Sequence, residues 1–310
     1  MENSSRQNQP PKVTSYTYGE DAYQKYMAEY YKESKVVSAS NHEYLRVRLA
    51  FDLVEKWVLP RLSCKPRAET IVIDIACSVG TFAIEFAKQG YRSFGVDFDP
   101  DAIKIARRLN EEEGTNAVFA EMDVSDWNGS FPPIDIAICF DVFEHLHDDE
   151  LGTLLYTLKS LFSPDGALVF HSLPQQYDYL FWNQQKNIVE FPFLLKPFKN
   201  CRTEVFEKIV KMYALLQDMK SVYRTGLTHK EGIKRSDHPN PLTKGRLTDV
   251  FERASYEILT IDSGFLGNVQ IDQRDRQSFI NQPLTHRSLF GVAVPARRNA
   301  PALPKDKLLT

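Results

Sequence analysis

The sequence predicts an α/β protein with a doubly wound sheet of seven strands, most of them parallel. Short apolar runs alternate with helical patterns between residues 70 and 172, as they do where crossover helices connect parallel strands. The run Thr70–Ala76 (TIVIDIA) is apolar almost throughout, which is typical of a strand buried on both faces. A helix and two strands after residue 240 return to the same pattern. We therefore expect one sheet covered by helices on both sides.

Two helices are expected ahead of the sheet, over residues 20–34 and 41–59. The first is rich in tyrosine. The second carries apolar side chains at the i, i+3, i+4 and i+7 positions of one face, namely Ala50, Leu53, Val54 and Trp57. Pro60 is expected to end it.

The strands of the sheet and the helices between them follow at short spacing. Strands are expected over 70–76, 92–97, 117–121, 134–140, 167–172, 256–262 and 288–294. Helices are expected over 80–89, 100–113, 148–162 and 243–254. Gly90 is a typical helix end, and Ser-Pro-Asp-Gly at 163–166 is a typical turn.

The domain organisation follows from where this alternation begins and stops. Polar residues and prolines predict disordered tails at 1–15 and 296–310. The units between them are N-terminal helices at 16–60, the core at 61–174, an insertion at 175–240 and the end of the core sheet at 241–295. The insertion is helical or irregular and rich in aromatic residues, so we expect it to form a lid over a substrate. Packing of these aromatic residues onto the core, or a dimer interface, is the alternative.

Composition and charge exclude several classes of protein. The chain has 310 residues, of which 43% are hydrophobic and 25% charged, as in an ordinary globular protein. A net charge of −3 gives no basic excess, which disfavours nucleic acid as a partner. No apolar run approaches the ~20 residues that span a bilayer, no signal peptide is evident, and the four cysteines form no C-x-x-C pair. We therefore expect a cytoplasmic protein without zinc or disulfides.

The first expected strand leads into the run DIACSVG, from Asp74 to Gly80, directly before a helix. In a doubly wound sheet, ligands bind beyond the carboxyl ends of the strands. Ala76, Ser78 and Gly80 are small enough to let a ligand approach the backbone, with Cys77 between them, and the N–H groups of the following helix can receive its polar groups. A tight turn without a ligand is the alternative.

Acidic residues also follow the second and third expected strands. Asp97 ends the second strand, where an acid can accept hydrogen bonds from two ribose hydroxyls. Asp123 follows the third strand and is placed to bind an adenine amino group, with Met122 and Val124 on either side of the ring. The alternative for an acid here is a helix N-cap, which suits Asp99 better than Asp97.

These strand ends resemble those of the class I S-adenosylmethionine-dependent methyltransferases that act on small molecules, of the ubiquinone-pathway type. The family's first motif is an acid followed by glycines at alternate positions, and here it reads Asp74, Ala76, Ser78, Gly80, with two glycines replaced. The run FDVFEHLHD at 140–148 is similar to the family's E-x-x-E-H-x-x-D segment. SPDGALVF at 163–170 is similar to its L-x-P-G-G-x-L entry to strand five. The resemblance covers about 40–174 and 240–295.

The resemblance implies a Rossmann-like fold with an antiparallel last strand, and S-adenosylmethionine as the cofactor. Asp97 and Asp123 match the family's acids after strands two and three, and Phe98 and Phe140 complete the expected cofactor-binding set. The N-terminal helices are expected to cover the cofactor, with Arg46 pairing with its carboxylate. Tyr26 or Tyr30 would close over it, and ordinary surface positions are the alternative for all three.

Methyl transfer to a hydroxyl also needs a base whose pKa lies near the working pH. His145, just past strand four, is the first candidate, and His171, at the end of strand five, is the second. The alternatives are that His145 shapes the start of a helix and that His171 is a core residue. Asp141 and Glu144 beside His145 resemble a cluster associated with a divalent cation in the ubiquinone-pathway relatives. Because acids at a helix start commonly stabilise its dipole, no metal is assigned.

The expected function is transfer of a methyl group to a small-molecule acceptor that is partly apolar or aromatic. Oxygen is the expected methylated atom, and nitrogen or carbon stays open. A non-catalytic partner protein that binds the same cofactor is the alternative from another class, and a homodimer is left open. A nicotinamide dehydrogenase would need G-x-G-x-x-G, and Ala76-x-Ser78-x-x-Thr81 fits that motif poorly.

Overall fold

The structure of the chain is a computed structural model. It describes residues 29, 31–38, 41–62, 65–123, 132–183, 185–186, 188–226, 240–266, 270–271 and 273–296. The expected tail at 1–15, the C-terminal tail beyond Ala296, and the predicted site residues Tyr26, Tyr30 and Val124 lie outside the described residues.

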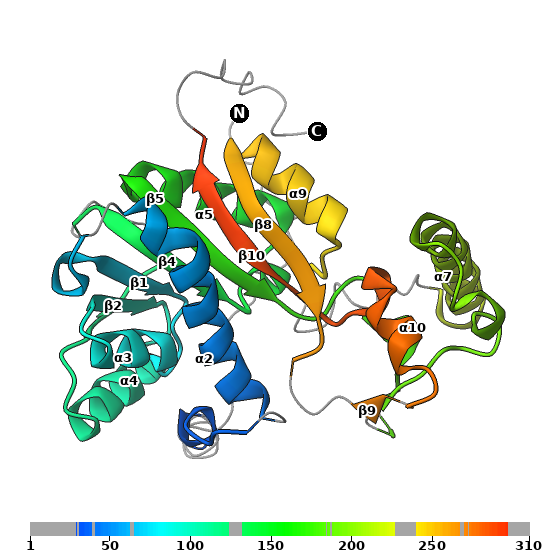
Figure 1. Cartoon of the computed structure of the whole chain (residues 1–310), viewed down its shortest axis with the longest axis horizontal. Coiled ribbons are helices and arrows are strands. Elements are labelled where there is room, and N and C mark those ends of the chain that lie inside the picture. Colours follow the sequence, from blue (N-terminus) through cyan, green and yellow to red (C-terminus); the bar gives the residue numbers. More distant parts are fainter. Residues whose placement is uncertain are drawn as a thin grey trace, which may run out of the picture.

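The described part of the chain contains the predicted sheet, in the strand order β3-β2-β1-β4-β5-β10-β8 (Figure 1). Its strands are β1 Ile71–Ile75, β2 Arg92–Asp97, β3 Val118–Glu121, β4 Ile134–Phe140, β5 Phe162–Ser172, β8 Tyr256–Gly264 and β10 Ser288–Pro295. The pairs β2–β3, β1–β2, β1–β4 and β4–β5 are parallel, whereas β10 runs antiparallel to both β5 and β8. The prediction of a doubly wound, mostly parallel sheet with an antiparallel last strand is confirmed.

Strand β5 begins earlier than the sequence pattern predicts. Phe162 pairs with Ile134 ahead of a register shift, so that the Ser-Pro-Asp-Gly turn lies within the strand as an irregularity rather than before it. The order of the strands reverses between β1 and β4, because β1 pairs with β2 on one side and with β4 on the other. A ligand of a doubly wound sheet binds at this point, beyond the carboxyl ends of the strands.

Helices cover both faces of the sheet (Figure 1). They are α2 His42–Leu53, α3 Thr81–Lys88, α4 Pro100–Glu112, α5 Asp148–Leu161 and α9 Lys244–Arg253. Successive residues of β1 face opposite sides, so that Ile73 packs with α5 and α9 while Val72 packs with α2 and α3. Helix α2 continues as a π-helical turn, Val54–Val58, and a 3-10 turn, Leu59–Arg61, which together occupy the region of the second predicted helix.

A smaller lobe lies beside the sheet and is built from two separate parts of the chain (Figure 1). Its helices are α6 Asp178–Phe181, α7 Thr203–Thr225 and α10 Arg276–Ile280, and its small sheet pairs β6 Trp182–Asn183, β7 Ile188–Val189 and β9 Gln270–Ile271. Phe279 stacks on Phe191 with ring centroids 3.9 Å apart. The insertion predicted at 175–240 thus shares one apolar core with residues from the connection between β8 and β10, and it contains short strands as well as helices.

Within the described ranges, no helix combines the length and the apolar character that crossing a membrane requires.

Candidate functional site

The turn between β1 and α3 has a left-handed backbone at three alternate positions. Ala76 has φ 54°, Ser78 has φ 47° and Gly80 has φ 80°, a region that only glycine adopts without strain. The N–H of Cys77 donates to the Val96 carbonyl at 2.9 Å, which ties the turn to β2. The backbone therefore keeps the shape of an alternate-glycine turn, although two of its three positions carry a small side chain.

Close packing explains why glycine stands at position 80. A Cβ added to Gly80 would collide with the ring of Phe119 and would lie 3.1 Å from the Cβ of Ala106. The side chain of Cys77 is buried in the same region, and burial raises the pKa of its thiol well above the usual value. Cys77 therefore contributes to the turn through its backbone and packing rather than as a reactive thiolate.

Asp97, at the end of β2, is held by the backbone of the neighbouring loops. Its Oδ2 accepts a hydrogen bond from the Ser78 N–H at 2.8 Å, and its Oδ1 accepts one from the Asp99 N–H at 2.9 Å. Burial raises the pKa of this carboxyl group, and the backbone donors oppose the shift. Each carboxylate oxygen keeps further acceptor capacity, so Asp97 is oriented at the point where ribose binding is predicted. Asp99 forms the N-cap of α4, as the sequence indicates.

Asp74, at the end of β1, is an almost completely buried acid. Its Oδ2 accepts a hydrogen bond from the Ala83 N–H at 3.3 Å, in the first turn of α3. Burial, with a smaller contribution from the neighbouring Asp97, raises its pKa to about 8. The carboxyl ends of β1 and β2 therefore hold two acids with raised pKa values, whose ionised forms a cationic ligand would stabilise.

The residues expected around an adenine ring gather beside Asp97. The N–H of Met122 donates to the Asp97 carbonyl at 2.8 Å, which joins the ends of β2 and β3. Phe98 is 56% exposed although it follows a buried strand, so its ring is available to a ligand. Asp123 is exposed at the same edge. The structure thus places Asp97, Phe98, Met122 and Asp123 at the same edge of the sheet. Their contacts with a nucleotide remain a prediction.

Asp141, just past β4, links three elements of the site. Its Oδ1 lies 2.5 Å from Nδ1 of His171 at the end of β5, and its Oδ2 lies 2.5 Å from Nη2 of Arg46 on α2. Its backbone is left-handed, with φ 56°, and its N–H donates to the His171 carbonyl at 2.9 Å. Burial alone would raise the pKa of Asp141, but Arg46 and His171 outweigh it and hold the pKa well below the usual value.

His171 is completely buried, and burial lowers its pKa, against the opposing effect of Asp141. A neutral imidazole that donates from Nδ1 to Asp141 leaves Nε2 as an acceptor. Among the described residues, Nε2 of His171 has no hydrogen-bond partner. Its ring lies between those of Phe140 and His42, with centroid distances of 5.4 and 6.4 Å. The result is an oriented imidazole whose second nitrogen is buried and has no partner among the described residues.

Arg46 lies at the predicted edge of the sheet, but protein carboxylates surround its guanidinium. Its Nη1 donates to Oε2 of Glu43 at 2.7 Å, in addition to the contact with Asp141, and its guanidinium lies 5.7 Å from the ring centroid of Phe82. Its pairing with a cofactor carboxylate therefore remains a prediction. Sequence reasoning missed Glu43 and His42, although Glu43 precedes Arg46 by three positions, a spacing that places both on one helix face.

His145 and Glu144 lie in the 3-10 turn Phe143–His145 that follows β4. His145 is partly exposed, and its N–H donates to the Val142 carbonyl at 3.0 Å. Glu144 is buried and accepts hydrogen bonds from the Ser172 hydroxyl at 2.9 Å and the Leu173 N–H at 3.3 Å. Burial and the nearby Asp141 raise its pKa. No group of three or more potential metal ligands is assembled among the residues that the structure describes.

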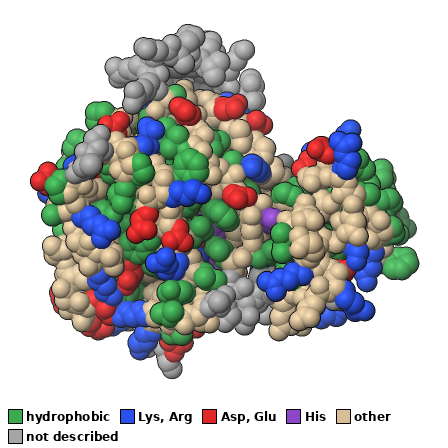
Figure 2. Space-filling view, viewed as in Figure 1, with side chains coloured by type: hydrophobic (Ala, Val, Ile, Leu, Met, Phe, Trp, Pro, Cys, Tyr) green, Lys and Arg blue, Asp and Glu red, His purple; other side chains and the backbone are tan. Residues whose placement is uncertain are grey.

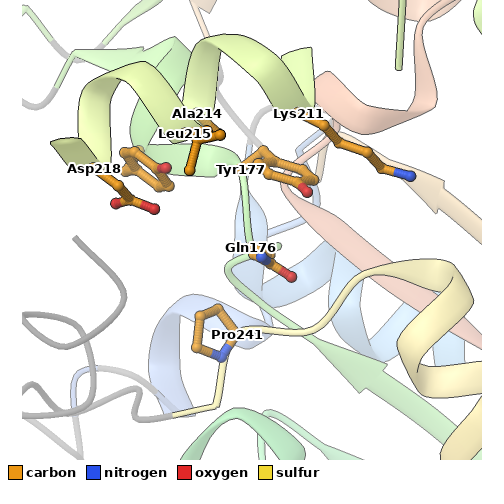
Figure 3. A pocket seen from close by; sticks show the side chains of 8 residues that line it. Gln176, Tyr177, Lys211, Ala214, Leu215, Asp218 and Pro241 are labelled. Atoms are coloured by element: carbon orange, nitrogen blue, oxygen red, sulfur yellow. The ribbon is translucent and has the colours of Figure 1, made fainter. Parts of the chain in front are cut away.

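A cavity of about 210 Å³ lies between α7 and the chain that follows β5 (Figure 3). Its lining residues are Gln176, Tyr177, Tyr179, Lys211, Ala214, Leu215, Asp218 and Pro241. The chain beside Pro241 is tied to the turn after β4, because the Asn240 N–H donates to the Glu144 carbonyl at 2.9 Å. The cavity is therefore connected to the turn after β4 through Asn240 and Pro241, and several of its walls are aromatic or apolar.

Comparisons with known proteins agree with this arrangement. Residues 72–166 match a sequence profile described as a methyltransferase domain. The ubiquinone biosynthesis O-methyltransferase of Actinobacillus pleuropneumoniae is 25% identical over 174 residues, which cover 51% of this chain and 71% of that protein. The enzyme of the same name from Vibrio parahaemolyticus is 29% identical over 185 residues, which cover 58% of this chain and 73% of that protein.

A solved structure has a similar fold. It is an S-adenosylmethionine-dependent methyltransferase from Clostridium acetobutylicum, with a TM-score of 0.52 and 12% identity, and the alignment covers 89% of this chain and 100% of that one. The matched domain runs from β1 to the start of β5, and so includes the left-handed turn and the acids that follow β1, β2 and β3. The fold, the strand-end acids, the domain match and the relatives together identify the chain as a member of the class I S-adenosylmethionine-dependent methyltransferases, which use S-adenosylmethionine as methyl donor.

Proposed function

We propose that this enzyme methylates a hydroxyl group of a small, partly apolar or aromatic acceptor in a biosynthetic pathway. The observation that carries the proposal is the Asp141–His171 pair, in which the oriented imidazole keeps an unpartnered acceptor nitrogen. A hydroxyl nucleophile must lose a proton as it attacks, and such a nitrogen can take it. The names of the two relatives as O-methyltransferases support the same chemistry.

The residues at the sheet edge fit S-adenosylmethionine. Asp97 would accept the ribose hydroxyls, Phe98 and Met122 would flank the adenine, and Asp123 would accept its amino group. The small side chains of the turn leave its backbone accessible to the methionyl part. When bound, the cofactor supplies a methyl group on a sulfonium, whose positive charge the acids at this edge would stabilise.

We assign the role of base to His171 in preference to His145. Burial keeps the His171 imidazole neutral, so Nε2 is ready to accept a proton, and Asp141 would stabilise the imidazolium that forms. A buried nitrogen without a partner costs about 1–3 kcal/mol, which a hydroxyl donor would recover. His145 is partly exposed beside the same edge and is the alternative base. Asp141 acts through His171 and is a positioning residue.

The cavity beside α7 is the proposed acceptor site. Tyr177, Tyr179 and Leu215 provide aromatic and apolar surface, and Lys211 and Asp218 provide charge. A volume of about 210 Å³ suits a small molecule rather than a protein or RNA segment. We also propose a cytoplasmic location, which fractionation of the source cells would test.

The test is turnover with catechols, phenols and aliphatic alcohols, followed as formation of S-adenosylhomocysteine, with product NMR to identify the methylated atom. His171→Gln should lower kcat by about 10²–10⁴-fold, with little change in affinity for S-adenosylhomocysteine, and should remove the acidic limb of the kcat–pH profile. His145→Gln, the matched variant, should retain most activity. Methylation of nitrogen or carbon, or binding without turnover on any acceptor class, would refute the O-methyltransferase proposal.

A further inference from the structure

The outer face of α7 is an exposed apolar stripe with a regular spacing. Between 43% and 93% of each residue is exposed for Val205, Met212, Leu215, Leu216, Met219, Val222 and Tyr223. The opposite face packs into the lobe core through Phe206, Val210 and Ala214. The helix is thus apolar on two sides, and the described residues cover only one of them. Figure 2 shows hydrophobic side chains along the outer edge of the lobe that contains α7.

The exposed stripe has the spacing of a helix-pairing seam. Val205, Met212 and Met219 recur every seven residues, and Lys208, Leu215 and Val222 stand three positions after them. Lys208 is the one charged residue among these six positions, and its alkyl chain can lie along the seam with the ammonium group in water. A repeat of seven with alternating steps of three and four places side chains where they interlock with a second helix. A helix of 23 residues is about 35 Å long, and its exposed apolar side chains amount to several hundred Å², the order of the ~800 Å² per partner of a standard interface.

The charges at one edge of the stripe indicate an identical partner in the opposite direction. In an antiparallel pair related by a two-fold axis, each edge of one helix meets the same edge of its partner. With the axis between Tyr213 and Ala214, Met212 faces Leu215 of the second copy, Val205 faces its Val222, and Met219 faces the alkyl chain of its Lys208. Lys211 then lies beside Asp218 of the second copy, and the two-fold axis repeats this opposite-charge contact. A parallel pair would bring Lys211 toward the apolar Leu216 instead.

A lipid surface fits the helix less well. Amphipathic helices that bind anionic membranes carry a basic polar face. In α7 the basic residues Lys208, Lys211, Lys220 and Arg224 are nearly balanced by the acidic residues Glu204, Glu207 and Asp218. We infer that α7 pairs antiparallel with α7 of a second copy, so that the enzyme is a homodimer joined through its smaller lobes.

Sedimentation velocity of the full chain between about 1 and 100 µM tests the inference. The wild type should sediment as a dimer of the 35.7 kDa chain. Met212→Glu should weaken dimerisation at least tenfold, because the two-fold axis brings the new charge on each copy against the apolar Leu215 of the other copy. Tyr156→Glu is the matched control, since Tyr156 is 70% exposed on α5, and it should leave the dimer intact. Circular dichroism of each variant confirms that it is folded.

Charge reversal tests the direction of the pair. Lys211→Glu and Asp218→Lys should each weaken the dimer, and the double variant should restore it. Because this edge also borders the cavity, the readout is the oligomeric state and not activity. A monomeric wild type, an intact Met212→Glu dimer, or a double variant without recovery would overturn the inference. A monomer that pellets with phosphatidylcholine–phosphatidylglycerol vesicles, and loses this binding in Met212→Glu, would show that the stripe contacts lipid instead.

Discussion

Replacing Ser78 by glycine should stabilise the protein, although the substitution removes a side chain. Ser78 has φ 47°, and its hydroxyl is buried with no hydrogen-bond partner among the described residues. The left-handed backbone costs about 1–2 kcal/mol for a residue with a Cβ, and the unsatisfied hydroxyl costs about 1–3 kcal/mol. The greater freedom of glycine in the unfolded chain offsets about 0.5–1 kcal/mol of the gain. We expect the free energy of unfolding to rise by about 1–4 kcal/mol.

Urea unfolding followed by circular dichroism measures this change as a higher midpoint. Ser78→Ala separates the two contributions, because it removes the hydroxyl and keeps the backbone strain. Ser160→Gly is the matched control: Ser160 is exposed near the end of the right-handed helix α5, where glycine should cost about 0.5 kcal/mol. If Ser78→Gly destabilises the protein as Ser160→Gly does, the turn is not strained and the reasoning is wrong.

Three further predictions concern the same edge of the sheet. Burial raises the pKa of Asp74 from 3.8 to about 8. Between pH 3.8 and about pH 8, the unfolded state therefore releases a proton that the folded state keeps. The free energy of unfolding should fall as pH rises through this range, by up to about 1.4 kcal/mol per pH unit. Asp74→Asn should flatten this dependence in urea unfolding at pH 5 to 8, and an unchanged slope would contradict it. Asp97→Asn should weaken S-adenosylhomocysteine binding about 10–100-fold, measured by calorimetry. Asp99→Asn is the control, since it keeps a good N-cap and should bind with unchanged affinity. Equal affinities of the two variants would refute the role of Asp97 in binding the ribose. Gly80→Ala should lower the free energy of unfolding by about 2–4 kcal/mol, through backbone strain and collision with Phe119. Gly90→Ala is the control: Gly90 has φ 84° and open space around it, so this variant should lose only the strain contribution. Equal losses in the two variants would show that the packing around Gly80 accommodates a methyl group.

The sheet could be predicted because its strands leave a strong local signal. Strands such as β4, Ile134–Phe140, are buried on both faces, so apolar residues run without interruption. The early start of β5 could not be predicted, because a proline and a glycine at 164 and 166 are typical of a turn, and pairing with Ile134 overrides that preference. The local sequence pattern predicts that a strand or helix exists, whereas the residues at which it begins and ends depend on the elements that pair with it.

The positions of the candidate site residues in the fold could be predicted from the sequence, whereas the contacts between their side chains could not. Asp97 and the turn from Ala76 to Gly80 follow from their places after strands. The contacts of Arg46 do not, because Glu43 and Asp141 come from different elements and only the fold brings them together. For the same reason His171 was the second candidate base: its orientation by Asp141 is a contact between two strand ends.

The smaller lobe has a consequence for attempts to separate or exchange it. The chain enters this lobe after β5, returns to α9, enters it again after β8 and returns to β10. A deletion of 175–240 would remove Phe181 and Phe191 from beside Phe279, leaving Phe265 as its aromatic neighbour and much of that ring exposed. Any transplant between related enzymes must therefore carry both passages of the chain, grafted after β5 and before α9 for the first and after β8 and before β10 for the second.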